Sequence, residues 1–160
     1  MLTQNQINEF FDIGYIVLEN LFQKNEIDEI GACIDRLQKE AEGIHETKIH
    51  KGAQFVCEGT RIDRIVWAGA AEPKLLEYGA DQRILQPVSQ LLGTKKMQQL
   101  INQIHPKIPG DQVKFDWHQD SQHRGFGHEG WTDVNGKGSY VQCLLAVDEN
   151  TMDNGPVYFI

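Results

Sequence analysis

The feature that most constrains the fold is the second half of the chain, where short β-forming segments alternate with turns. From about residue 94 onward, four segments have the composition of strands: Met97–His105, Val113–Trp117, Tyr140–Val147 and Val157–Ile160. Glycine and proline separate them, and Asp153-Asn154-Gly155-Pro156 is a strong turn sequence. A parallel α/β sheet would require helices between the strands, so this order favours a β-sandwich or jelly roll.

The beginning of the chain is predicted to be helical. Thr3 and Gln6 form a capping-box sequence for a first helix, which Gly14 ends. Tyr15–Leu18 is a short apolar run rich in β-forming residues and is predicted to be a buried strand. A further strand is predicted at Gln54–Cys57, inside an otherwise irregular stretch.

Two more helices are predicted in the first 93 residues. One begins at about Asn25, keeps apolar residues at helical spacing and ends at Gly43. The other covers Ile84–Leu92, where Pro87 requires either a kink or a later start.

We expect residues 1–160 to form a single domain. It would consist of a helical front with one or more short strands, 1–93, and the first part of a β core, 94–160. A chain of 160 residues can bury a core, and 40% hydrophobic and 24% charged residues are typical of globular proteins. The predicted fold class is therefore mainly β with N-terminal helices.

The charge and hydropathy of the chain argue against two classes of partner. A net charge of −8, with scattered lysine and arginine, argues against nucleic-acid binding. No apolar run approaches the length of about 20 residues that spans a bilayer, and the first residues do not form a secretory signal. Three cysteines without a C-x-x-C pair indicate reduced thiols. We therefore predict a cytoplasmic protein.

The sharpest candidate site is His118-Gln119-Asp120, directly after the predicted strand Val113–Trp117. Side chains two positions apart on a strand point to the same face, so His118 and Asp120 are expected to project together. An imidazole and a carboxylate supply two corners of the 2-His-1-carboxylate triad, which leaves open positions on Fe(II) for a co-substrate and dioxygen. We therefore predict that His118 and Asp120 are metal ligands and catalytic residues.

Four segments of the chain, in order, resemble the phytanoyl-CoA dioxygenase family. They are the N-terminal strand Gly14–Leu21 with the helix after it, the Lys-x-Pro-Gly turn Lys107–Gly110, the proximal metal motif Phe115–Asp120, and the strand Leu144–Glu149 followed by Asn154-Gly155-Pro156. The resemblance covers nearly the whole chain. It implies a double-stranded β-helix of the jelly-roll or cupin-like type, incomplete at the C-terminus of this chain.

The resemblance also implies a chemistry. Members of the family use Fe(II) and 2-oxoglutarate as cofactors, with O2 as co-substrate, to hydroxylate a small or lipid-like molecule. His118 and Asp120 correspond to two of the metal ligands. The family's second histidine would fall about four residues beyond Ile160, and its 2-oxoglutarate-binding arginine later still. We therefore expect this chain to be a fragment with little or no activity by itself.

Lys107 and Gln103 are the candidates for binding the co-substrate. Lys107 fits a position near 2-oxoglutarate or at the substrate entrance, and a solvated turn lysine is an equally good interpretation. Gln103 and His105 share a strand face by their spacing, where either side chain can bond to the co-substrate or face water.

Two other functions remain open. A cupin-like zinc or manganese enzyme would use His118, Asp120 and His123 as ligands for hydrolysis or isomerisation. A non-catalytic β-sandwich binding module would bind partners without a metal. Metal analysis separates these functions, because zinc retained through dialysis favours the former and failure to bind any divalent ion favours the latter. The sequence specifies neither the substrate nor the oligomeric state.

Overall fold

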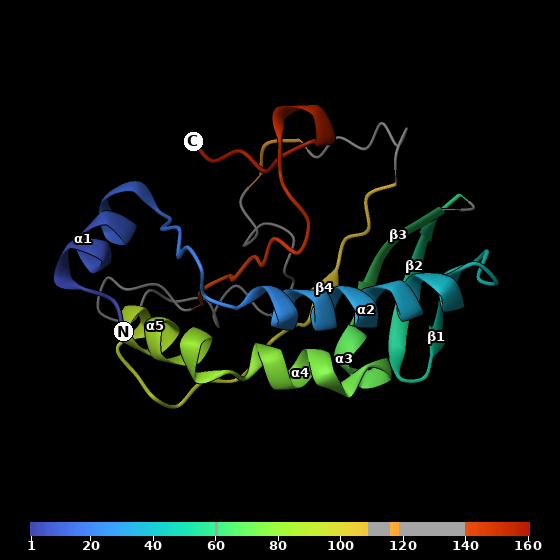
Figure 1. Cartoon of the computed structure of the whole chain (residues 1–160), viewed down its shortest axis with the longest axis horizontal. Helices are drawn as coiled ribbons and strands as arrows, with labels where there is room; N and C mark the ends of the chain where they lie inside the picture. The colour runs from blue at the N-terminus through green and yellow to red at the C-terminus, as the bar shows by residue number, and fades with distance from the viewer. Residues whose placement is uncertain (60, 109–115, 119–139) are drawn as a thin grey trace. The chain divides into compact units, whose positions relative to one another are not determined.

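The computed structural model describes residues 1–59, 61–108, 116–118 and 140–160 (Figure 1). The chain divides into two compact units. The helical unit comprises Met1–Glu19, Gln82–Gln98 and Gln112–Cys143, and the sheet unit comprises Asn20–Asp81, Gln99–Asp111 and Leu144–Ile160.

The sheet unit contains a four-stranded antiparallel sheet in the order β1-β2-β3-β4 (Figure 1). Its strands are β1 (Lys48–His50), β2 (Ala53–Glu58), β3 (Arg61–Val66) and β4 (Gln103–Ile104). Lys51 and Gly52 join β1 to β2 with φ of 50° and 83°. Positive φ at both central residues is what a two-residue type I′ hairpin turn requires. The strand predicted at Gln54–Cys57 is confirmed within β2, and β1 is an additional strand.

Helix α2 (Lys24–Ala41) supplies much of the core of the sheet unit. It begins with a capping box, in which the Gln23 backbone nitrogen donates to Glu26 Oε2 at 2.8 Å. Phe55 and Ile65 are register partners on β2 and β3, and both are fully buried. They pack with the buried residues of the helix, which are Ile30, Cys33, Leu37 and Ala41. The helix predicted between Asn25 and Gly43 is thus confirmed.

Two short helices follow β3 in the sheet unit: α3 (Ala68–Ala71) and α4 (Pro73–Gly79). Asn102 holds the start of α3. Its backbone carbonyl accepts from the Ala68 nitrogen at 3.0 Å, and its Oδ1 accepts from the Gly69 nitrogen at 3.0 Å. Because Asn102 directly precedes β4, the same two bonds fix the point at which that strand begins.

Helix α1 (Gln4–Ile13), in the helical unit, follows its sequence signals closely. Both hydrogen bonds of the capping box predicted for Thr3 and Gln6 are present. Gly14 ends the helix in a left-handed conformation, with φ of 89°. A side chain at that φ would be strained, which explains why glycine stands there.

Helix α5 (Gln82–Leu92) confirms the third predicted helix but begins slightly earlier than predicted. Pro87 lies inside the helix and is buried. The Gln90 side chain accepts from the Leu2 nitrogen at 2.7 Å and donates to the Leu2 carbonyl at 3.1 Å. This double contact attaches the N-terminus to α5 within the helical unit.

Three predicted strands are wrong. The described residues of Tyr15–Leu18, Tyr140–Val147 and Val157–Ile160 belong to no strand, and Met97–His105 is reduced to β4. β-branched and aromatic residues favour an extended backbone locally, but a strand also needs a neighbouring segment that continues a ladder of hydrogen bonds. Within Val113–Trp117, the two residues that the structure describes, Asp116 and Trp117, are likewise not in a strand.

The sheet lies earlier in the chain than predicted, since β1, β2 and β3 all precede residue 94. The described residues therefore contain a small antiparallel sheet with helices, and the double-stranded β-helix stays a prediction. The predicted loop at 121–138 lies outside the described residues. In the described part of the chain, no helix has the length and apolar character needed to cross a membrane.

Candidate functional site

His118 lies among the described residues, whereas Asp120 lies outside them. The His118 side chain is exposed, and its Nδ1 lies 2.6 Å from the backbone carbonyl oxygen of Asp116. A carbonyl oxygen only accepts hydrogen bonds, so Nδ1 carries the proton and the lone pair of the neutral ring lies on Nε2. Metal-bound histidines commonly have this arrangement, in which a carbonyl orients the ring and Nε2 faces the metal.

The contact of His118 with the Asp116 carbonyl lies within one tripeptide, and neither residue is in a strand. The shared face predicted for His118 and Asp120 therefore stays a prediction. Within the described ranges, no group of three or more His, Cys, Asp or Glu side chains is placed to hold a metal ion. The alternative ligand His123 also lies outside the described residues.

Gln103 and His105 interact directly, although β4 ends at Ile104 and His105 lies just beyond it. Gln103 Nε2 lies 2.9 Å from His105 Nε2. An amide nitrogen only donates, so His105 Nε2 accepts and its Nδ1 carries the proton. Gln103 is half-buried on β4, the last strand of the sheet, where it pairs with Val66 of β3. The neighbouring imidazole thus fixes the direction of the Gln103 amide.

Lys107 is exposed, and its ammonium group donates to the backbone carbonyl of Gly155. This contact brings together Lys107 and Gly155, which are 48 residues apart in the sequence. Sequence reasoning assigned Lys107 to a ligand or to solvent and missed Gly155. No local signal identifies a partner so distant along the chain.

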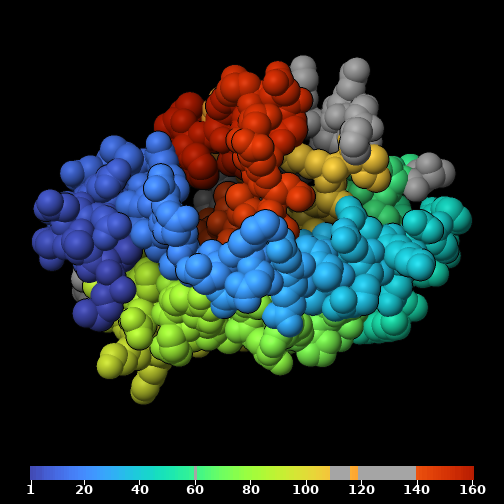
Figure 2. Space-filling view, viewed as in Figure 1, coloured from blue at the N-terminus to red at the C-terminus, as the bar shows by residue number. Residues whose placement is uncertain are grey.

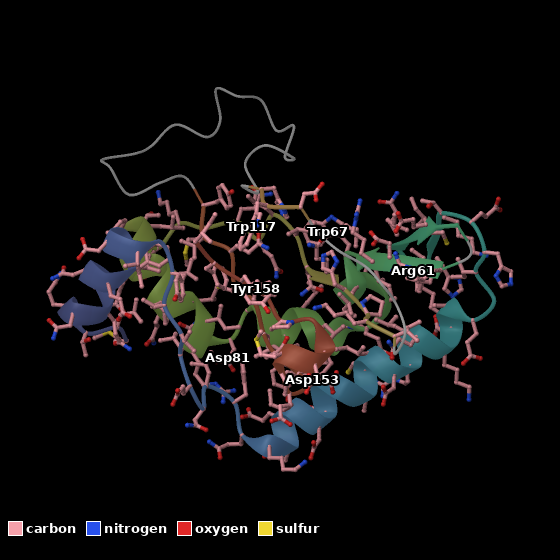
Figure 3. All side chains as sticks on the ribbon, turned by 90° about the horizontal axis from the view of Figure 1, so that it is seen from above. Arg61, Trp67, Asp81, Trp117, Asp153 and Tyr158 are labelled. Carbon is pink, nitrogen blue, oxygen red and sulfur yellow. The ribbon has the colours of Figure 1, made fainter. Side chains whose placement is uncertain are left out.

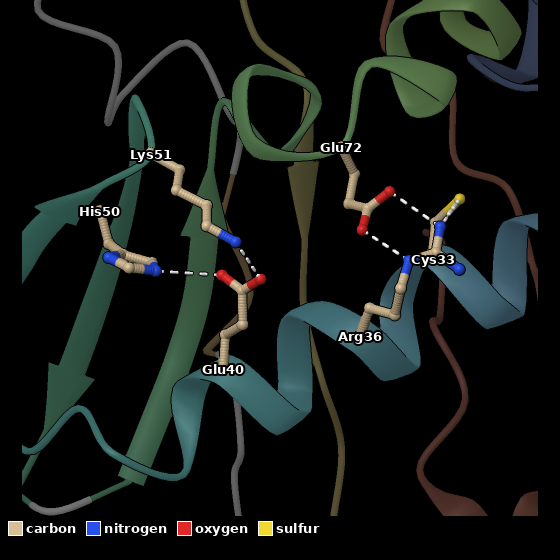
Figure 4. A network of polar contacts seen from close by, with 6 residues as sticks. All are labelled: Cys33, Arg36, Glu40, His50, Lys51 and Glu72. Atoms are coloured by element: carbon tan, nitrogen blue, oxygen red, sulfur yellow. Dashed lines mark hydrogen bonds and ion pairs between the residues drawn. The ribbon is translucent and has the colours of Figure 1, made fainter.

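An ion-pair group on α2 was also missed (Figure 4). Glu40 accepts from His50 Nε2 at 3.0 Å and from Lys51 Nζ at 2.5 Å. The hydrogen bond from Lys51 is the main cause that lowers the pKa of Glu40. The sequence signal that could have revealed this group is Lys51-Gly52, which as a hairpin turn places His50 and Lys51 at the end of β1.

A second group connects α2 to the start of α4 (Figure 4). Arg36 donates to both carboxylate oxygens of Glu72, at 2.7 and 2.8 Å, and its Nη2 lies 3.2 Å from Cys33 Sγ. The bond from Arg36 lowers the pKa of Glu72, and burial raises the pKa of the Cys33 thiol. A buried thiol with a raised pKa is a poor nucleophile, so Cys33 is not a candidate catalytic residue.

The family model described as phytanoyl-CoA dioxygenase matches residues 10–160 of the chain. The matched range extends through both units and includes Gln103, Lys107, His118 and Asp120. No curated protein and no solved structure matches the chain.

Proposed function

The chain belongs to the phytanoyl-CoA dioxygenase family, and on this premise we propose that the protein is a dioxygenase that hydroxylates a small or lipid-like organic molecule. The family is one of Fe(II)- and 2-oxoglutarate-dependent oxygenases. The main structural support for assigning a role to His118 is the contact between its Nδ1 and the Asp116 carbonyl. This contact supports the proposal, because metal-binding histidines commonly donate from one ring nitrogen to a carbonyl oxygen.

His118 and Asp120 are the proposed ligands of the iron. His118 fits this role because its Nε2 carries the lone pair, and the carboxylate of Asp120 would add the negative charge that balances a divalent cation. When bound, Fe(II) and 2-oxoglutarate would activate O2, the oxidant, so that one oxygen atom converts 2-oxoglutarate to succinate and CO2 and the other hydroxylates the substrate. The contribution of the chain is to hold the imidazole ring in one orientation before the metal arrives, which lowers the entropic cost of binding.

Lys107 and Gln103 are the proposed contacts for 2-oxoglutarate. The Lys107 ammonium carries three protons, of which the bond to Gly155 uses one. Its charge is suited to a carboxylate of the co-substrate. The Gln103 amide, held by His105, would add an oriented polar group on the same face. We further propose that a second histidine and an arginine, as the family implies, complete the site, and that the protein is cytoplasmic.

Substrate-independent formation of succinate tests the proposal. The protein is expressed from its complete reading frame and incubated with Fe(II), O2 and 2-oxoglutarate. We expect succinate from the parent protein, a loss of at least a hundredfold for His118→Ala, and unchanged turnover for the exposed control His45→Ala. An absence of turnover, or turnover that His118→Ala leaves unchanged, refutes the assignment. Zinc that stays bound through dialysis favours the cupin-like alternative.

A further inference from the structure

Residues 144–160 return to the sheet unit through an apolar and a polar contact. The apolar contact is Val147, which packs against the buried core cluster and lies near Gly31 of α2. Figure 2 shows this segment, in red, beside α2, in blue. The polar contact is the bond from Lys107 to the Gly155 carbonyl. Between and beyond these contacts the apolar side chains are mostly exposed, as they are at Leu144, Val157, Tyr158 and Phe159.

The segment between the two contacts contains a turn with its own internal bonds, which we call the 149–155 turn. The Thr151 nitrogen donates to Asn154 Oδ1 at 2.9 Å, and the Asn154 nitrogen donates to the Thr151 carbonyl at 3.2 Å. Asn154 Nδ2 also donates to the Glu149 carbonyl, and Gly155 closes the turn with φ of 72°. Figure 3 shows the side chains of this region, with Asp153 labelled. These bonds determine the conformation of the turn. Its position depends on contacts with residues outside the turn.

Lys107 connects this turn to the proposed co-substrate residues. Gln103, His105 and Lys107 follow one another at every second position, and the first two are hydrogen-bonded. The Lys107 ammonium can bond to the Gly155 carbonyl and to an anion at the same time, because it has three donors. A β-carbon built on Gly155 would lie 3.6 Å from Lys107 Nζ, so the two groups are in close contact.

We propose that Lys107 is a positioning residue. It holds the 149–155 turn in place through the bond to the Gly155 carbonyl, and a carboxylate bound at Lys107 makes that turn more ordered. This coupling rests on the proposed function, whereas the contact with the turn stands independently of it. A carboxylate that binds Lys107 restricts the rotation of the lysine side chain. The bond to Gly155 then costs less conformational entropy, and the turn becomes more ordered.

Amide hydrogen exchange at Thr151 and Asn154 tests the contact without any ligand. In the full chain, we expect Lys107→Met to accelerate exchange of both amides by about fivefold, since the methionine side chain keeps the length but cannot donate. Lys107→Arg should restore exchange close to that of the parent, and Lys95→Met is the matched control on an exposed lysine. Parent-like exchange in Lys107→Met, or equal acceleration in Lys95→Met, overturns the proposal. Unchanged exchange of the core amides of α2 establishes that Lys107→Met is folded.

Addition of 2-oxoglutarate with Mn(II) tests the coupling. We expect the two amides to gain about threefold protection in the parent and in Lys107→Arg, relative to Mn(II) alone, and to gain none in Lys107→Met. Equal protection in Lys107→Met overturns the coupling. If Lys107→Met accelerates exchange but the co-substrate protects no variant, the coupling is overturned together with the assignment of Lys107 to 2-oxoglutarate, and the contact with Gly155 is upheld.

Discussion

Residues 20–81 and residues 144–160 belong to the same compact unit, yet they are held in different ways. In the first region, α2 and the β1–β3 strands bury a continuous core, and two ion-pair groups connect the helix to its neighbours. In the second, Val147 contacts the core and Lys107 holds Gly155, while most apolar side chains stay exposed. The first region depends on many cooperating contacts, and the second on a few that can be removed one at a time.

This difference separates the residues that stabilise the fold from those that position the 149–155 turn. A region with many buried contacts resists opening, whereas a region with few opens at low cost. The residues of the first region determine whether the unit folds. Those of the second determine where the 149–155 turn lies. Substitutions in the first region should therefore lower the free energy of unfolding more than those in the second, whose effects should stay local.

The largest effect is expected for Phe55→Ala. Phe55 is fully buried on β2, so its removal should lower the free energy of unfolding by about 3–5 kcal/mol. Urea unfolding measures the change, and Ile49→Ala on β1 is the control, since Ile49 is 75% exposed. A loss for Phe55→Ala no larger than that for Ile49→Ala would show that the core does not lie where we describe it.

A smaller effect is expected for Val147→Ala, which weakens the apolar contact of the second region. Val147 is partly buried against the core, so we expect a loss of about 1 kcal/mol in urea unfolding. Leu144→Ala is the matched control, because Leu144 is 61% exposed and should change little. If both substitutions have the same effect, Val147 is not the anchor of this segment.

Gly31→Ala sharpens the comparison because it probes the face of α2 near Val147. Alanine favours the helix over glycine by about 0.5–1 kcal/mol. The added β-carbon would lie 3.7 Å from Val147 Cγ1, which is an ordinary contact. We therefore expect a small increase in thermal and urea stability. A decrease would mean that the 144–160 segment packs more tightly on α2 than its contacts indicate.

The smallest change in unfolding free energy is expected for removal of the ion pair between Arg36 and Glu72, and this change depends on pH. Arg36 lowers the folded-state pKa of Glu72, so the pair stabilises the fold above the unfolded pKa of about 4.3. That stabilisation is lost as the pH falls through the lowered pKa. The difference in unfolding free energy between the parent and Glu72→Gln should therefore shrink on acidification below about pH 4. A difference independent of pH, or an equal trend in the exposed control Glu46→Gln, contradicts this.

Sequence signals predicted the elements that local bonds determine. The capping box at Thr3, the stop at Gly14 and the periodicity of α2 all correspond to structure within a few residues of the signal. The hairpin turn at Lys51-Gly52 has a weaker signal, because only Gly52 is of a residue type that favours the positive φ found at both positions.

The sequence did not predict elements that depend on distant partners. Tyr15–Leu18 and Val157–Ile160 have the composition of strands, but composition does not specify which segment will lie beside them. The bond of Lys107 to Gly155 crosses 48 residues, and no periodicity reports it. His118 is intermediate, because its type and spacing suggested a ligand and its orientation depends on the Asp116 carbonyl.

The central claim is that His118 and Asp120 bind one ferrous ion, and anaerobic equilibrium dialysis with Fe(II) tests it most directly. We expect at least a tenfold loss of Fe(II) affinity in His118→Ala and in Asp120→Ala, with the affinity of His45→Ala equal to that of the parent. Fe(II) binding that survives both ligand substitutions unchanged would contradict it.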